Sequence, residues 1–99
     1  MKVTKNLDNR KLTVAVEGRL DTLTAPELEK ELAPALAGIE SLVVDLAELA
    51  YISSAGLRVL VGAAQTMDDQ DGEMAVVNAN EDVKNIFDIT GLTDVLGVR

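Results

Sequence analysis

A short and almost continuously apolar run, Leu42–Leu46, constrains the fold of this chain more than any other stretch. Runs of this kind are typical of the central strands of parallel sheets. Segments with helical periodicity lie on both sides of it, at residues 28–36, where leucines recur every four positions, and at residues 57–64. Because parallel strands need a long crossover between them, a strand between two helices predicts an α/β fold.

Before these segments, a pattern of period two predicts a β-hairpin. The predicted strands are Val3–Leu7 and Leu12–Val16, with a turn at Asp8-Asn9. In the second strand, apolar side chains fall on one face and smaller or polar ones on the other, as Leu12, Val14 and Val16 alternate with Thr13, Ala15 and Glu17. This alternation predicts a sheet that is covered by helices on one side only.

The boundaries of the first helix follow from local motifs. Thr24-Ala25-Pro26-Glu27 has the sequence of a capping box with a proline in the first turn, so the helix is expected to begin near Pro26. Pro34 removes one backbone hydrogen bond inside the helical pattern. We therefore expect the helix to be kinked or shortened before Gly38.

The second half of the chain alternates in the same way. Ala47–Ile52 is predicted to be a connection, and a helix is predicted to follow it until the polar stretch Gln65–Gly72 ends that helix. Met74–Val77 is the next predicted strand. A third helix is predicted between Asn80, a suitable cap, and Gly91, a suitable terminator.

Together these patterns predict one domain, residues 1–99, with an α/β fold: a small open mixed sheet of about four strands with helices mainly on one face. Both crossovers should be right-handed and step the same way across the sheet. The third strand and Ser53-Ser54 after it then lie at the sheet edge where ligands collect in open α/β folds. The segment Gly18–Thr22, which leaves the second strand at the same end, should be their neighbour.

The composition excludes several classes of function. There is no cysteine and no histidine, so thiolate zinc sites and the commonest general base are missing. We expect no enzymatic activity, no cofactor and no metal; a cation site at Asp21 and Asp45 is disfavoured because Asp45 lies within the apolar run. The net charge of −8 argues against nucleic acid, and it favours a partner with a basic patch or serves solubility alone. Without a long apolar run or a basic leader, we expect a cytoplasmic protein with no membrane insertion.

Two serines, Ser53 and Ser54, open the second predicted helix. The first backbone N–H groups of a helix have no partner within it, and aligned peptide dipoles place about half a positive charge there. Such a position favours a phosphate. Either hydroxyl can therefore be a phosphoacceptor, or it can serve as the helix N-cap, which stabilises a helix by about 1 kcal/mol.

Several motifs that follow one another along the chain resemble the motifs of the bacterial anti-sigma factor antagonists, the STAS domains. They are Gly18–Asp21, then Val43–Leu46 followed by Tyr51–Leu57, and finally Phe87–Leu92, so the resemblance covers nearly the whole chain. It implies the STAS fold and a partner-switching cycle. In this cycle the antagonist binds an anti-sigma factor with serine kinase activity, releases a sigma factor and is inactivated when the kinase phosphorylates one serine. A serine phosphatase is a further implied partner.

The resemblance assigns the phosphoacceptor to Ser54, with Ser53 as the second candidate. In the family this serine commonly follows an aspartate and precedes a second hydroxyl residue, and Ser53 and Ala55 occupy those positions here. We expect the protein to be monomeric when free. The partner-binding surface is expected to contain Asp21, Thr22, Ser53, Ala55, Gly56 and Arg58.

Several of these residues have an alternative structural role. Asp21 can accept local backbone hydrogen bonds, Gly56 can be a packing glycine, and Arg58 can be solvated instead of pairing with a phosphate or the kinase. The residues Ser53 and Ala55 also leave a second function open. This is a non-phosphorylated STAS interaction subunit, in a lipid-transport complex or a stressosome-like scaffold.

Overall fold

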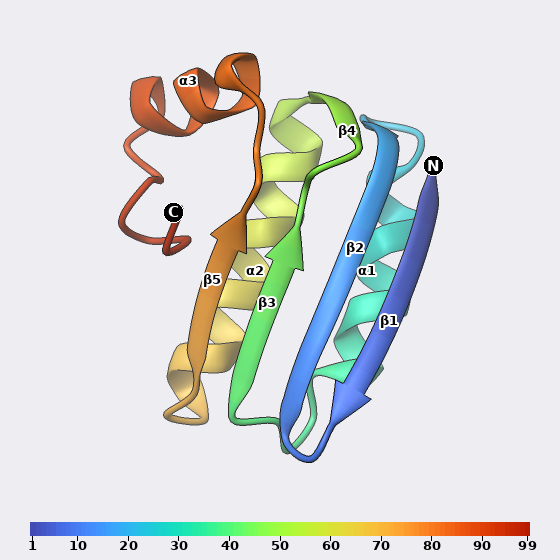
Figure 1. Ribbon diagram of the computed structural model, residues 1–99, viewed down its shortest axis with the longest axis vertical. Coiled ribbons are helices and arrows are strands. Elements are labelled where there is room, and N and C mark those ends of the chain that lie inside the picture. The colour runs from blue at the N-terminus through green and yellow to red at the C-terminus, as the bar shows by residue number, and fades with distance from the viewer.

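A five-stranded mixed sheet with two helices packed on one of its faces forms the body of the molecule (Figure 1). A computed structural model describes residues 1–99. The strands are β1 (Lys2–Asp8), β2 (Lys11–Leu20), β3 (Ser41–Asp45), β4 (Leu49–Ile52) and β5 (Glu73–Val77). The helices are α1 (Ala25–Ala35), α2 (Ser54–Asp69) and α3 (Glu81–Ile89). The predicted α/β class and the open mixed sheet are confirmed.

The strands follow the order β1-β2-β3-β5, and β4 pairs with the end of β2. β1 runs antiparallel to β2, whereas β2, β3 and β5 are parallel to one another, so the predicted hairpin and both crossovers are present. Both α1 and α2 lie behind the same face of the sheet in Figure 1, which makes the two crossovers right-handed as predicted. No helix has the length and apolar character needed to cross a membrane.

The core lies between the sheet and these two helices. The face of β2 toward the helices is buried and its opposite face is half-buried, as the alternation predicted. α1 contributes Leu28 and Leu32 to the core, and α2 contributes Leu60 and Met67. Every buried side chain is apolar, so the polar groups of this protein lie at its surface.

The start of α1 differs from the prediction. No capping box forms, because Thr24 has helical backbone angles and its hydroxyl donates to the carbonyl oxygen of Arg19 at 2.8 Å. The carboxylate of Asp21 instead accepts the backbone N–H groups of Leu23 and Thr24, at 3.0 and 3.1 Å. These two N–H groups precede the helix. The N–H of Ala25, the first residue of α1, donates to the backbone carbonyl oxygen of Asp21 at 2.8 Å, so the turn before the helix and not the predicted box holds this helix start.

Three other boundaries are set by single residues. The hairpin turn lies one position later than predicted, at Asn9-Arg10, with Asn9 in the left-handed region at φ 56°. α1 ends at Ala35, directly after Pro34, as the missing N–H predicted. α2 ends at Asp69, within the polar stretch Gln65–Gly72 that was predicted to end it. Met67 is buried within its last turns and continues the apolar stripe while the polar neighbours face solvent.

The prediction of a connection at Ala47–Ile52 was wrong, because Leu49–Ile52 forms β4. β4 runs parallel to the end of β2, beyond a shift in register between Gly18 and Arg19. Gly18 has φ +92°, a conformation that glycine adopts without strain. Through this bulge, β2 pairs with β3 along one part of its length and with β4 at its end.

At the other side of the sheet, the chain end covers the edge of β5. The side chain of Asn80 accepts a hydrogen bond from the backbone of Val83 at 2.8 Å, which confirms the predicted cap of α3. After α3 the chain turns back, buries Leu96 and bridges to β5 through Val98. β1 therefore remains the open edge of the sheet.

Gly56 allows the first turn of α2 to lie directly against the strand ends. A Cβ atom at this position would lie 2.7 Å from Cγ of Leu20 and 2.9 Å from Cγ1 of Ile52, closer than non-bonded carbons approach. Both of these side chains are buried, so neither can move out into solvent. The absence of a side chain at Gly56 thus fixes where α2 begins relative to β2 and β4.

This contact predicts opposite effects of the same substitution at two glycines of α2. Gly56→Ala should destabilise the protein by about 1–3 kcal/mol through overpacking. Gly62→Ala, where a Cβ meets no atom within 4 Å, should stabilise it by about 0.5–1 kcal/mol through the better helix propensity of alanine. Urea unfolding of both variants measures the two changes. Equal effects at both positions would show that the close contact at Gly56 does not constrain the fold.

Candidate functional site

The structure brings together two segments that are far apart in the sequence, the end of β2 and the start of α2. Leu20 pairs with Ile52, and the backbone N–H of Ser53 donates to the carbonyl oxygen of Leu20 at 2.9 Å. The turn that leaves β2 therefore lies beside the two serines, as predicted. This shared edge is the candidate site.

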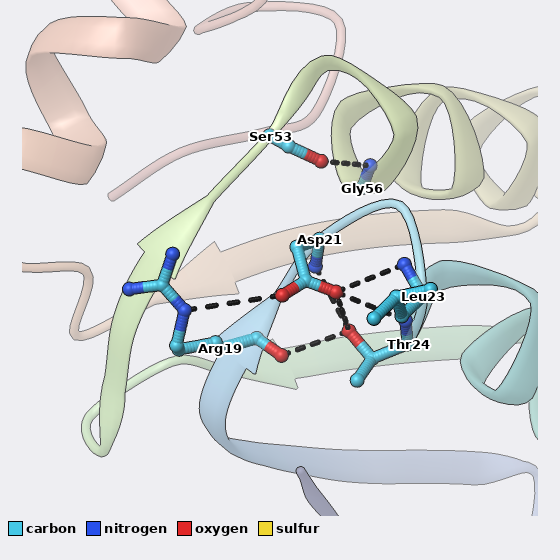
Figure 2. A network of polar contacts seen from close by, with 6 residues as sticks. All are labelled: Arg19, Asp21, Leu23, Thr24, Ser53 and Gly56. Carbon is cyan, nitrogen blue, oxygen red and sulfur yellow. Dashed lines mark hydrogen bonds and ion pairs between the residues drawn. The ribbon is translucent and has the colours of Figure 1, made fainter.

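The two serines have different roles in the helix start. Ser53 is the N-cap residue of α2, and its Oγ accepts the N–H of Gly56 in a long hydrogen bond of 3.5 Å (Figure 2). Ser54 is the first residue of the helix, is exposed, and forms no side-chain hydrogen bond. The capping role is thus filled by Ser53, which leaves the hydroxyl of Ser54 accessible to another protein.

The charge around the start of α2 suits an anion. No acidic residue lies in the first turn of this helix. Arg58, one turn after Ser54, is exposed and takes part in no ion pair. A phosphate on Ser54 would meet the partial positive charge of the helix start and a basic side chain at i+4. The helix start and Arg58 thus both place positive charge on this side of Ser54.

Asp21 organises the turn that leaves β2. Its Oδ1 accepts hydrogen bonds from the backbone of Leu23 and Thr24 and from the hydroxyl of Thr24 (Figure 2). The pKa of Asp21 is lowered below its ordinary value of 3.8, mainly by the backbone hydrogen bond from Thr24. The backbone hydrogen bond from Leu23, the hydrogen bond from the Thr24 hydroxyl and the positive charge of Arg19 lower this pKa further. A carboxyl with a lowered pKa stabilises the fold at pH values above its ordinary pKa, and this contribution disappears as the pH falls through the folded value. The local hydrogen bonds predicted as an alternative role of Asp21 are present.

A second contact at this edge involves Arg19 and Tyr51. The guanidinium carbon of Arg19 lies 4.3 Å from the centre of the Tyr51 ring, and its Nε lies 3.8 Å from Oδ2 of Asp21. The sequence did not identify this pair, because the two residues meet only where β4 pairs with β2. A prediction of β4 would have placed them opposite each other.

A shallow recess joins three more of the expected site residues. Thr22, Ala55 and Arg58 line it, together with the start of α1, and its volume is about 180 Å³. Gly56 is buried beneath the surface, where packing explains the need for glycine; its role in partner binding stays a prediction. No group of three or more acidic side chains is arranged to hold a metal ion.

Two curated relatives named anti-sigma-B factor antagonist are similar in sequence to this chain. The chain is 37% identical over 87 residues to the anti-sigma-B factor antagonist of Staphylococcus epidermidis, a match that covers 87% of this chain and 81% of the relative. The anti-sigma-B factor antagonist of Staphylococcus aureus is 35% identical over the same share of both chains.

Solved structures share the fold. The anti-sigma factor antagonist SpoIIAA in its unphosphorylated form superimposes with a TM-score of 0.86 at 15% identity, covering 99% of this chain and 88% of that one. An anti-sigma factor antagonist from Mycobacterium paratuberculosis gives a TM-score of 0.87 at 24% identity, covering 98% and 83%. The family model of the STAS domain matches residues 1–99. The chain belongs to the STAS domain family.

Proposed function

We propose that this chain is an anti-sigma factor antagonist that binds a kinase-type anti-sigma factor in the cytoplasm and is switched off by phosphorylation of Ser54. The names of the staphylococcal relatives support the antagonist function. The structural neighbour SpoIIAA, which is also known in a phosphorylated form, supports a phosphorylation switch. The observation that carries the proposal is the exposed, unbonded hydroxyl of Ser54 at the start of α2.

The proposed switch acts on binding rather than on folding. A phosphate adds about −1.5 to −2 charges at pH 7. The start of a helix favours such a charge by about 0.3–1 kcal/mol, or up to about 2 kcal/mol in a partly buried setting, so the domain stays folded. A partner surface packed over Ser54 must instead desolvate the phosphate and place its own carboxylates beside it, at a cost of several kcal/mol.

The two residues that depart from the family pattern are compatible with this mechanism. Ser53 supplies the N-cap of α2, a role in which serine and aspartate are about equally good. Ala55 lies half-buried in the recess beside Arg58 and offers no competing hydroxyl. Ser54 is then the exposed hydroxyl of the first turn.

Phosphate transfer to Ser54 is the first test. The purified chain is incubated with each kinase-type anti-sigma factor of its own genome and Mg-ATP, and the modification is mapped by mass spectrometry. We expect one phosphate on Ser54, none on the Ser54→Ala variant, and retained phosphorylation of Ser53→Ala, the matched control. Stable binding without any modification would instead support the non-phosphorylated interaction subunit. Phosphate on Ser53 would show that Ser53, and not Ser54, is the phosphoacceptor.

The second test separates charge from size at the same position. Ser54→Asp should weaken binding of the anti-sigma factor at least tenfold, equivalent to about 1.4 kcal/mol, while the melting temperature stays close to that of the wild type. Ser54→Asn, which is nearly isosteric with Ser54→Asp but neutral, should bind more tightly than the charged variant. Isothermal titration calorimetry gives both affinities. Equal affinities of the two variants would contradict a switch based on charge.

A further inference from the structure

Leu23 is an apolar side chain displayed on a rigid turn. It is 83% exposed, more than any other large apolar residue of the protein. Its backbone N–H donates to Asp21 at 3.0 Å, and the next residue, Thr24, is bonded both to Asp21 and to the Arg19 carbonyl oxygen. The backbone of Leu23 has therefore already lost the freedom that binding would otherwise remove.

Arg19 and Tyr51 form a second exposed feature at this edge, and Figure 2 shows Arg19 on the side of Asp21 that faces away from Leu23 and Thr24. The guanidinium group of Arg19 lies over the Tyr51 ring, and its only ion pair is the long one from Nε to Asp21. Its terminal nitrogens have no protein partner, and Tyr51 is 40% exposed. Arginine and tyrosine, with tryptophan, are enriched among the residues that dominate the binding energy of protein interfaces.

One carboxylate thus orders two exposed features that lie next to the candidate switch. Oδ1 of Asp21 holds the Leu23 turn, and Oδ2 faces Arg19. The same edge holds Ser53, whose N–H bonds to Leu20. A partner that senses a phosphate on Ser54 must cover this edge, and the two features are positioned to be covered with it.

We infer that Leu23 and the Arg19–Tyr51 pair form a preformed docking surface for the anti-sigma factor of the proposed function, on which this inference rests. The complementary surface of that partner has an apolar recess for Leu23 and a carboxylate for the terminal nitrogens of Arg19. A second copy of this chain is disfavoured as the occupant, because each copy carries a net charge of −8. Asp21 is a positioning residue in this surface.

The test compares matched residues at the two ends of the sheet. Leu23→Ser should weaken binding of the anti-sigma factor that phosphorylates Ser54 at least tenfold. Leu7→Ser is the control, because Leu7 is 61% exposed and pairs with the opposite end of β2, and it should change the affinity less than twofold. Arg19→Gln should weaken binding at least threefold, whereas Arg10→Gln, at the β1–β2 turn, should not. Urea unfolding of each variant verifies that the fold is intact.

The role of Asp21 is measured by a double-variant cycle. Asp21→Asn should weaken binding, and Leu23→Ser should cost less affinity in the Asp21→Asn background than in the wild type, because the turn no longer holds the leucine in place. Additive losses would show that Asp21 acts independently of Leu23 and would overturn its positioning role.

The outcomes distinguish this inference from the proposed function. If Ser54→Asp loses binding while Leu23→Ser and Leu7→Ser both bind like the wild type, the docking surface is wrong and the switch stands. If sedimentation shows a dimer of the wild type that Leu23→Ser dissociates, the occupant is a second copy and the inference is overturned. If the wild type binds none of the kinase-type anti-sigma factors, both proposals fail.

Discussion

The contact between the first turn of α2 and the ends of β2 and β4 determines the geometry of the whole candidate site. It requires a residue without a side chain at Gly56, because a Cβ atom there would overlap Leu20 and Ile52. With this contact, the N–H of Ser53 reaches Leu20, and Ser54 is left exposed at the rim. A tightly packed core and an accessible hydroxyl are thus separated by a single helical turn.

The same arrangement would allow a small domain to carry the proposed switch at Ser54. The apolar core lies between the sheet and the helices and contains no buried polar side chain. A charge added to Ser54 would therefore not have to enter the core, and the free N–H groups of α2 would partly compensate for it. Stability and binding could then respond differently to the proposed phosphorylation.

Much of this architecture was predictable, because it depends on patterns that are local in the sequence. The alternation in Leu12–Val16, the apolar run Leu42–Leu46 and the helical stripe after Ser54 identified the main strands and helices and their order. From this order alone the meeting of Gly18–Thr22 with the serines could be predicted, because parallel strands end at the same edge. The resemblance to the STAS family then singled out Ser54, which the sequence pattern alone would not have separated from Ser53.

The features that the sequence did not reveal depend on contacts between distant segments. Thr24 has the sequence of a capping residue, but its hydroxyl donates to the carbonyl oxygen of Arg19, and the N–H of Ala25 is bound by the backbone carbonyl oxygen of Asp21. β4 has only four residues and exists because the bulge at Gly18 turns the end of β2 toward it, so the contact of Arg19 with Tyr51 was equally hidden. Secondary-structure propensity describes a segment by itself, whereas these contacts between distant segments arise only once the sheet has formed.

The proposed switch is tested most directly with a chain that carries phosphoserine at position 54, incorporated during synthesis. Its affinity for the anti-sigma factor and its ¹H–¹⁵N NMR spectrum are compared with those of the unmodified chain. If phosphorylation of Ser54 acts on binding and not on folding, the affinity falls at least tenfold while the amide signals of the core strands stay in place. Unchanged affinity, or a loss of affinity accompanied by loss of the folded spectrum, would contradict the proposed switch.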